Sequence, residues 1–327
     1  MSILRTRMLM IFYRELSQLV GSGVTIIEAM NILSNQAGDF RLKRIAAEMK
    51  EYLSGGSSLG DAFAKFPDIF PSLHINIIKY SETAGRPAQG LGSMADYLEK
   101  EYAMQQGLIA GLAYPVVLLH AAIFLLPIIN AVSCGIGAYI LGVLSMLVPI
   151  YGFVFLIYAA SRMRRFEQFK TAFDSFVLSI PKIGGIVRQF VLTRFIRALQ
   201  VLSASGVSII SGWRMAAEAC GNNVIKTALL RGLPFIENGE SLSRAFIETR
   251  VFRPAMIGMI TAAEKSGSIV GALNSIAVFS DKENETAVAV LVRIIPIFVY
   301  LAVAGYIGFR IISFYVGYFN RIFSLPF

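Results

Sequence analysis

The feature that most constrains this chain is a run of 60 consecutive residues without Asp, Glu, Lys or Arg, between Glu101 and Arg162. An uncharged run of this length is typical of segments that cross a bilayer. Composition agrees, because 55% of the 327 residues are hydrophobic and only 16% are charged, against about 25% in soluble proteins. We therefore expect a membrane protein, and this composition excludes an ordinary soluble enzyme and a disordered chain.

The uncharged run divides at a short group of small and polar residues, which predicts two membrane-spanning helices over 108–132 and 138–160. Each is long enough to cross about 30 Å of hydrocarbon. A third apolar stretch over 288–312 contains Arg293 and Arg310, whose long side chains can reach towards opposite interfaces. The sequence thus predicts three transmembrane helices.

Basic residues predict the orientation of these spans. Arg162, Arg164 and Arg165 follow the second span, whereas the connector between the first two spans has no basic residue. By the positive-inside rule, the hairpin enters from the cytoplasm and returns to it. The amino terminus lacks a signal-peptide pattern and is expected in the cytoplasm, with a short periplasmic tail over 313–327.

An internal repeat organises the rest of the sequence. Residues 12–27 and 195–210 align at an offset of 183, with nine of 16 positions identical, where chance gives about one. The matches continue, with a slip of one residue, to the start of the apolar spans. We therefore predict an all-α protein with two copies of one cytoplasmic helical domain, over 1–107 and 161–287.

The repeated segments have helical spacing and end at glycines. Gly23 and Gly206 are expected to be the C′ residues that stop the first helix of each copy. Thr25 and Ser208 are expected to cap the helices that follow. We predict three or more short antiparallel helices in each copy and no strand.

A carboxylate recurs three residues before a glycine in both copies, as Glu82 before Gly85 and Glu264 before Gly267. A carboxylate in the last turn of a helix is opposed by the helix dipole, so we expect it to have a partner. We favour an ion pair, within the protein or between subunits; a contact with another protein or a divalent cation is the alternative. The candidate partners in the first repeated helix of each copy are Arg14 and Arg197.

No catalytic or metal site is predicted, and no cofactor is expected. His74 has no Cys or second His nearby, and the chain has no P-loop. His120 lies in the first span without a charged partner in the first two spans, so we interpret it as a neutral, hydrogen-bonded packing residue. Cys134 and Cys220 are expected on opposite sides of the bilayer, where they cannot form a disulfide.

The net charge of +9 does not indicate nucleic-acid binding. The first 107 residues carry 11 basic and 11 acidic side chains, and the basic excess lies largely beside the membrane.

Two prolines occupy nearly equivalent places, Pro115 in the first span and Pro296 in the third. Each is expected to kink its helix near the inner interface, although ordinary tolerance of proline in membrane helices is an equal alternative. Small residues such as Gly107 and Gly111 allow close approach of neighbouring helices.

Taken together, these motifs give the chain a resemblance to a known family. They are Phe12-x-Arg-x-Leu-x-x-Leu-x-x-Ser-Gly-Val, the Glu82-x-x-Gly85 segment before Pro115, and Pro181-Lys-Ile-Gly-Gly185 followed by Arg194-Phe-x-Arg-x-Leu-x-x-Leu-x-x-Ser-Gly206. Over almost its whole length the chain resembles the type II secretion F / type IV pilus assembly platform family.

The resemblance implies two six-helix cytoplasmic bundles and a homo-oligomeric platform in the bacterial inner membrane. It further implies that the platform links a cytoplasmic assembly ATPase to pilin or pseudopilin subunits. Other inner-membrane assembly proteins are implied as further partners. Its implied role is mechanical, without enzymatic activity. The alternative is a small membrane transporter built from an internal repeat, although three spans with one histidine offer no convincing midplane site. A membrane-bound enzyme ranks third.

Overall fold

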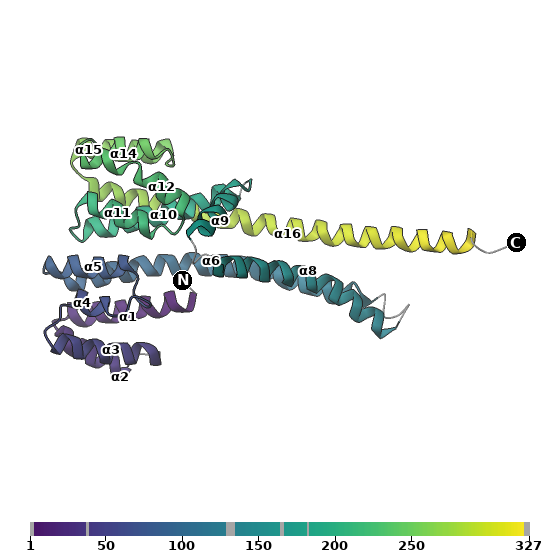
Figure 1. Ribbon diagram of the computed structural model, residues 1–327, viewed down its shortest axis with the longest axis horizontal. Coiled ribbons are helices and arrows are strands. Elements are labelled where there is room, and N and C mark those ends of the chain that lie inside the picture. Colours follow the sequence, from purple (N-terminus) through teal and green to yellow (C-terminus); the bar gives the residue numbers. More distant parts are fainter. Residues whose placement is uncertain (1–2, 37–38, 129–134, 164–166, 182, 324–327) are drawn as a thin grey trace. The chain divides into compact units, whose positions relative to one another are not determined.

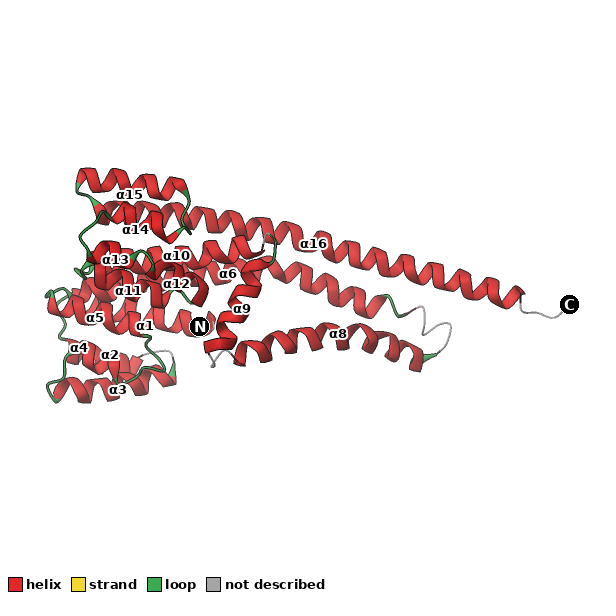
Figure 2. Cartoon of the chain, turned by 45° about the horizontal axis from the view of Figure 1, so that its top comes forward, coloured by secondary structure: helices red, strands yellow, loops and turns green. Residues whose placement is uncertain are grey.

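The chain is all-helical over the part that the structure describes. This computed structural model describes residues 3–36, 39–128, 135–163, 167–181 and 183–323. Helices joined by short loops fill these ranges, and none of the described residues forms a strand (Figure 2). The predicted all-α class is confirmed.

Contacts divide the chain into two compact units. The first unit contains Met1–Gln106 and Thr171–Glu285, and the second contains Gly107–Lys170 and Thr286–Phe327. We call the described residues of the two segments of the first unit the N-terminal lobe and the C-terminal lobe.

Figure 1 labels the helices along the chain. The N-terminal lobe contains α1 (Ile3–Gly21), α2 (Ile26–Gln36), α3 (Phe40–Ser54), α4 (Leu59–Ala64), α5 (Ser72–Thr83) and the first part of α6 (Pro87–Leu125). The C-terminal lobe contains part of α9 (Glu167–Ser179), α10 (Ile183–Ala204), α11 (Ile209–Ala219), α12 (Asn223–Leu230), α13 (Leu233–Glu237), α14 (Leu242–Thr249), α15 (Pro254–Ser266) and the first part of α16 (Ile269–Phe323).

Glycines stop the first repeated helix of each lobe, α1 and α10, as predicted. Gly23 has a φ of +92° and Gly206 a φ of +85°, in the left-handed region that favours glycine. The N–H of Val24 donates to the carbonyl of Leu19 at 3.1 Å, and that of Val207 donates to Leu202 at 3.0 Å. This six-to-one hydrogen bond defines a Schellman motif, so the C′ positions are confirmed.

The predicted N-caps are also confirmed. The Thr25 hydroxyl accepts from the N–H of Glu28 at 3.3 Å, and the Ser208 hydroxyl accepts from the N–H of Ser211 at 3.4 Å. Each hydroxyl satisfies one of the N–H groups that a helix start leaves without a partner.

Each lobe has an aromatic core of its own. Phe12, Tyr13, Phe63 and Phe70 are fully buried in the N-terminal lobe, where the rings of Phe63 and Phe70 lie 4.5 Å apart. The C-terminal lobe buries Phe195, Trp213, Phe246 and Phe252, and the rings of Phe246 and Phe252 also lie 4.5 Å apart. Three aligned pairs of phenylalanines thus occupy the two cores. Such rings supply much of the apolar area that stabilises a small helical bundle.

The second unit contains the apolar helices. It is formed by the rest of α6, by α8 (Ile136–Met163) and by the rest of α16. Among the described residues, one helix, Pro87–Leu125, is long and apolar enough to cross a membrane, and shorter apolar stretches cover Ile136–Gly152 and Val303–Ser313. The predicted spans over 138–160 and 288–312 lie within α8 and α16, and Cys134 lies outside the described residues.

Within this unit, α6 and α16 pack closely at a glycine. A Cβ atom added to Gly111 overlaps the side chain of Val292, so only glycine fits this contact without movement. Further along, the hydroxyls of Tyr114 and Tyr300 lie 2.8 Å apart and share a hydrogen bond. Pro115 and Pro296 are both inside these helices, which continue beyond them. A kink at either proline stays a prediction.

Replacing Gly111 with leucine is expected to destabilise the second unit by about 1–3 kcal/mol, because the larger side chain overpacks the contact with Val292. Thermal unfolding of the full chain in detergent measures this effect. The control is Gly137→Leu in α8, where an added Cβ meets nothing within 4 Å. Equal loss of stability in both variants would contradict the close approach of α6 and α16.

Candidate functional site

The repeated carboxylate binds the start of another helix in the N-terminal lobe. Glu82, near the end of α5, accepts hydrogen bonds from the N–H groups of Leu59 at 2.7 Å and Gly60 at 2.9 Å, at the start of α4. Gly85 then ends the helix with a φ of +70°. The negative charge is opposed by the dipole of its own helix but favoured by free N–H groups at the other one. Glu82 therefore joins two helices.

Glu264 makes the corresponding contact in the C-terminal lobe. Its carboxylate accepts hydrogen bonds from the N–H of Leu242 and, at 3.1 Å, from that of Ser243, at the start of α14. Gly267 ends α15 with a φ of +71°. The hydroxyl of Ser241 accepts from the N–H of Arg244, so side chains from two helices satisfy the start of α14.

The expected pairing of these glutamates with Arg14 and Arg197 is wrong. Arg14 instead donates to Asp96 and Glu99, both at 2.7 Å, and so ties α1 to α6. Arg197 donates to Asp281 through Nε at 2.7 Å and so ties α10 to α16. The carboxylates of Glu82 and Glu264 bind backbone N–H groups because these groups lack partners within their own helices, whereas the arginines reach acidic residues on a different helix.

An ion pair that the sequence did not predict connects the two lobes. Nη2 of Arg194 on α10 donates to Oε1 of Glu101 on α6 at 2.7 Å, and Nη1 donates to the carbonyl of Cys220 at 3.3 Å. Burial lowers the pKa of the Arg194 guanidinium, but the charge of Glu101, the charge of Tyr97 and the hydrogen bond to Glu101 together outweigh burial, so the pKa lies above its ordinary value. The sequence held one signal of this contact. Arg194 aligns with Ile11 in the first copy, so the charged residue is present in only one of the two copies.

The lobes also meet through helix packing. Helix α5 packs against α10 and α11. A small cavity of about 120 Å³ lies at this contact, between residues near the α5–α6 turn and residues 203–206 at the end of α10. Gly206 lines the cavity, so the helix stop that the sequence predicted lies at the boundary between the lobes.

Replacing Arg194 with methionine is expected to destabilise the full chain by about 1–3 kcal/mol, because the half-buried Glu101 carboxylate loses its partner. The Glu101→Met variant is expected to lose a similar amount, and the double variant less than the sum. Urea unfolding of all three variants measures the coupling. Arg214→Met is the matched control, since its ion pair with Glu237 is exposed and contributes under about 1 kcal/mol. Strict additivity would contradict the interlobe pair.

The two histidines pack through hydrogen bonds. Among the described residues, no group of three or more His, Cys, Asp or Glu side chains is placed to hold a metal ion. Within the second unit, His120 lies 2.8 Å from the carbonyl of Val116 and 2.8 Å from the hydroxyl of Tyr151, which agrees with the packing interpretation. Cys220 is fully buried, and its thiol donates to the carbonyl of Asn222 at 3.5 Å.

His74 lies in the core of the N-terminal lobe. Its Nδ1 shares a hydrogen bond of 3.2 Å with the buried hydroxyl of Tyr13. Burial, followed by the charge of Arg5, lowers the pKa of His74 to about 3, so the imidazole is neutral at cellular pH. The unfolded chain binds a proton at a pKa near 6.5, and folding therefore weakens as the pH falls from about 6.5 towards 3.

Replacing both partners by apolar residues, as Tyr13→Phe with His74→Met, is expected to remove this pH dependence. The aligned residues in the C-terminal lobe, Ile196 and Met256, are buried and apolar. Below pH 6.5, the stability of the double variant relative to the unaltered chain is expected to rise by up to about 1.4 kcal/mol per pH unit. Urea unfolding between pH 4 and 8 measures the difference, and parallel pH profiles for the two proteins would contradict it.

Comparisons with known proteins give a consistent result. The family model for type II secretion system (T2SS), protein F, matches residues 12–133 and again residues 195–317. The type II secretion system protein F of Aeromonas hydrophila is 29% identical over 329 residues, covering 94% of this chain and 84% of that protein. The type IV pilus assembly protein PilC of Myxococcus xanthus is 24% identical over 337 residues, covering 97% of this chain and 80% of that protein. Because the two matched segments include most of its residues, the chain belongs to the type II secretion system protein F family.

Proposed function

We propose that this chain is the inner-membrane platform of a type IV pilus or type II secretion machine, without catalysis of its own. In this proposal, two copies of a cytoplasmic domain, over 1–107 and 161–287, are carried by three membrane spans. The amino terminus is cytoplasmic and the short tail over 313–327 is periplasmic. The platform is a homo-oligomer that couples a cytoplasmic assembly ATPase to the insertion of pilin or pseudopilin subunits, together with other inner-membrane assembly proteins.

One observation carries the proposal, which is the double match of a single family model to this chain. Each match begins in the first repeated helix of a lobe, α1 or α10, and ends in an apolar stretch, which supports duplication of the unit formed by a domain and its span. The contacts of the two lobes agree with it. Arg14 binds Glu99, and Arg197 binds the aligned Asp281. Glu82 binds the start of α4, and Glu264 binds the start of the corresponding helix, α14.

The mechanical part of the proposal follows from the way the lobes are connected. The ion pair between Arg194 and Glu101 and the packing of α5 on α10 and α11 link the two lobes within one compact unit. A force applied by a motor protein to one lobe is then transmitted to the other. The helices that leave the lobes, α6 and α16, continue into the apolar unit, where a pilin helix has to be moved. Hydrolysis takes place in the partner ATPase.

We expect Glu264→Ala and Gly206→Leu to abolish assembly of the pilus or secretion pseudopilus. Glu264→Ala leaves the start of α14 without its carboxylate, and leucine at Gly206 is strained at a φ of +85° beside the interlobe cavity. Filament assembly in cells lacking the native chain measures the effect, and the purified partner ATPase should keep its basal hydrolysis.

Matched variants separate the site from general loss of folding. Gly206→Asn is expected to assemble filaments, because asparagine tolerates the left-handed region. Glu218→Ala changes an exposed carboxylate of the same lobe and is also expected to assemble them. Membrane abundance and protease resistance verify that each variant folds. Normal assembly by both Glu264→Ala and Gly206→Leu would count against this function for the two sites.

A further inference from the structure

We propose that the outer face of α15 binds the face formed by α1 and α2 of a second copy of this chain. This contact would repeat, between two chains, the contact that α5 makes with α10 and α11 within one chain. The inference rests on the duplication in the proposed function and adds the surface through which copies associate.

The contact between the lobes of one chain joins two different faces of the repeated domain. The N-terminal lobe contributes α5 and the adjoining part of α6, and the C-terminal lobe contributes α10 and α11. In the alignment, α10 and α11 correspond to α1 and α2, whereas α5 corresponds to α15. The lobes therefore associate head to tail. A head-to-tail contact between two copies of a domain leaves one complementary face uncovered at each end.

Burial identifies the uncovered face of the N-terminal lobe. On α10, Ala198 is fully buried and Val201 is 6% exposed. The aligned residues on α1, Glu15 and Gln18, are exposed. Ile11 on α1 aligns with Arg194 on α10, and it is 39% exposed. The difference in burial is explained if the N-terminal lobe lacks the neighbour that its counterpart has.

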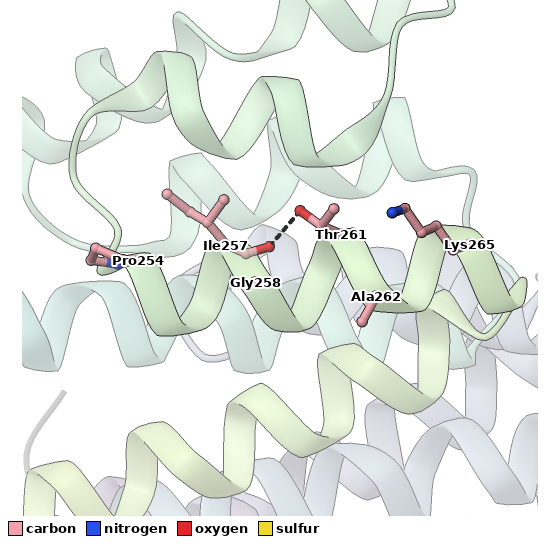
Figure 3. Close-up of a pocket in the computed structure, with 6 residues that line it drawn as sticks. All are labelled: Pro254, Ile257, Gly258, Thr261, Ala262 and Lys265. Atoms are coloured by element: carbon pink, nitrogen blue, oxygen red, sulfur yellow. Dashed lines mark hydrogen bonds between the residues drawn. The ribbon is translucent and has the colours of Figure 1, made fainter.

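The uncovered face of the C-terminal lobe is on α15. Leu73 and Ile77 of α5 are buried, but Ala255 at the first aligned position of α15 is exposed, and Met259 at the second is only half-buried. The adjoining side of α15 is also open, with a shallow space of about 550 Å³ over this face of the helix (Figure 3). It is lined by Pro254, Ile257, Gly258, Thr261, Ala262 and Lys265. Short side chains at Gly258 and Ala262 leave room for another helix.

The two faces carry complementary charge at corresponding positions. Lys265 on α15 aligns with Thr83, and Glu28 in the first turn of α2 aligns with Ser211. Thr83 ends α5 and Ser211 lies in the first turn of α11, and these two helices pack against each other where the lobes meet. Lys265 and Glu28 are both exposed, so the contact between two chains would gain an attraction between a lysine and a glutamate. The second copy of this chain is thus the occupant that its surfaces favour.

Such an interface has consequences for the assembly. Because two different faces meet, each copy can bind one neighbour through α15 and another through α1 and α2. Repetition of this contact produces a ring if the rotation closes and an open row if it does not. The polar side chains of Glu15, Gln18 and Glu28 favour a reversible association over a permanent one.

Cysteine cross-linking in native membranes tests the proposal. One tagged copy carries Glu28→Cys and a differently tagged copy carries Lys265→Cys, both in a Cys134→Ser background. Mild oxidation is expected to give a mixed dimer containing both tags, and a chain carrying both cysteines should give a ladder of larger species. Dimers formed by either single variant alone would indicate a two-fold interface and overturn the proposal, as would the absence of any mixed dimer.

Two controls complete the test. Pairing Lys265→Cys with Glu218→Cys, an exposed position on α11, should give no mixed dimer. Reversing one charge, with Lys265→Glu or Glu28→Lys, should lower co-purification of tagged copies about two- to fivefold, and combining both reversals should restore it. Failure of the double reversal to restore co-purification would count against the charge pair.

The outcome is independent of the proposed function, because cross-linking requires neither ATPase nor pilin. Loss of the cross-link in cells that still assemble filaments would overturn this interface alone. A cross-link in cells whose filaments and secretion do not depend on the chain would overturn the proposed function and leave the interface.

Discussion

The ends of short helices impose the constraint on which both lobes depend. Each helix leaves several N–H groups at its start and several carbonyls at its end without partners, and a bundle of many short helices multiplies these groups. The chain satisfies them with a small set of residues. Schellman glycines such as Gly23 and Gly206 close the helix ends, serine and threonine hydroxyls cap the starts, and Glu82 and Glu264 bind the start of a helix more than 20 residues away in sequence. Each of these carboxylates caps a helix other than its own and so holds two helices together.

The same domain fold in two different environments explains most of the differences between the lobes. Ala198 and Val201 are apolar and buried on α10, the helix that meets the N-terminal lobe, whereas Glu15 and Gln18 at the aligned places are polar and exposed. Arg194 is charged because Glu101 faces it across the boundary. Buried aromatic positions differ less, since Phe12, Phe63 and Phe70 have phenylalanine counterparts. The cores also differ in places, since the buried Tyr13 and His74 align with Ile196 and Met256, so the surfaces differ with their neighbours while the phenylalanine positions are shared.

Features that depend on near neighbours in sequence were predictable, and those that depend on distant ones were not. The stops at Gly23 and Gly206 follow from a few adjacent residues, and so does the cap at Thr25. The partners of Glu264 lie 21 and 22 residues earlier on a different helix, so a dipole argument predicts that a partner exists without identifying it. The pair between Arg194 and Glu101 requires knowledge of which faces of the two lobes meet, and periodicity carries no such information.

The distribution of packing indicates where a protein of this kind would yield to an applied force. Within a lobe, interlocked rings and charge-assisted bonds to helix starts resist deformation, because movement would open cavities or expose unpaired groups. Between the lobes, the contact includes the ion pair of Arg194 with Glu101, a small cavity and short side chains near Gly206. Movement at this boundary has to break the pair between Arg194 and Glu101, which costs less than opening a packed aromatic core. If the chain transmits force, the lobes therefore act as rigid bodies, and their boundary is the place where movement costs least.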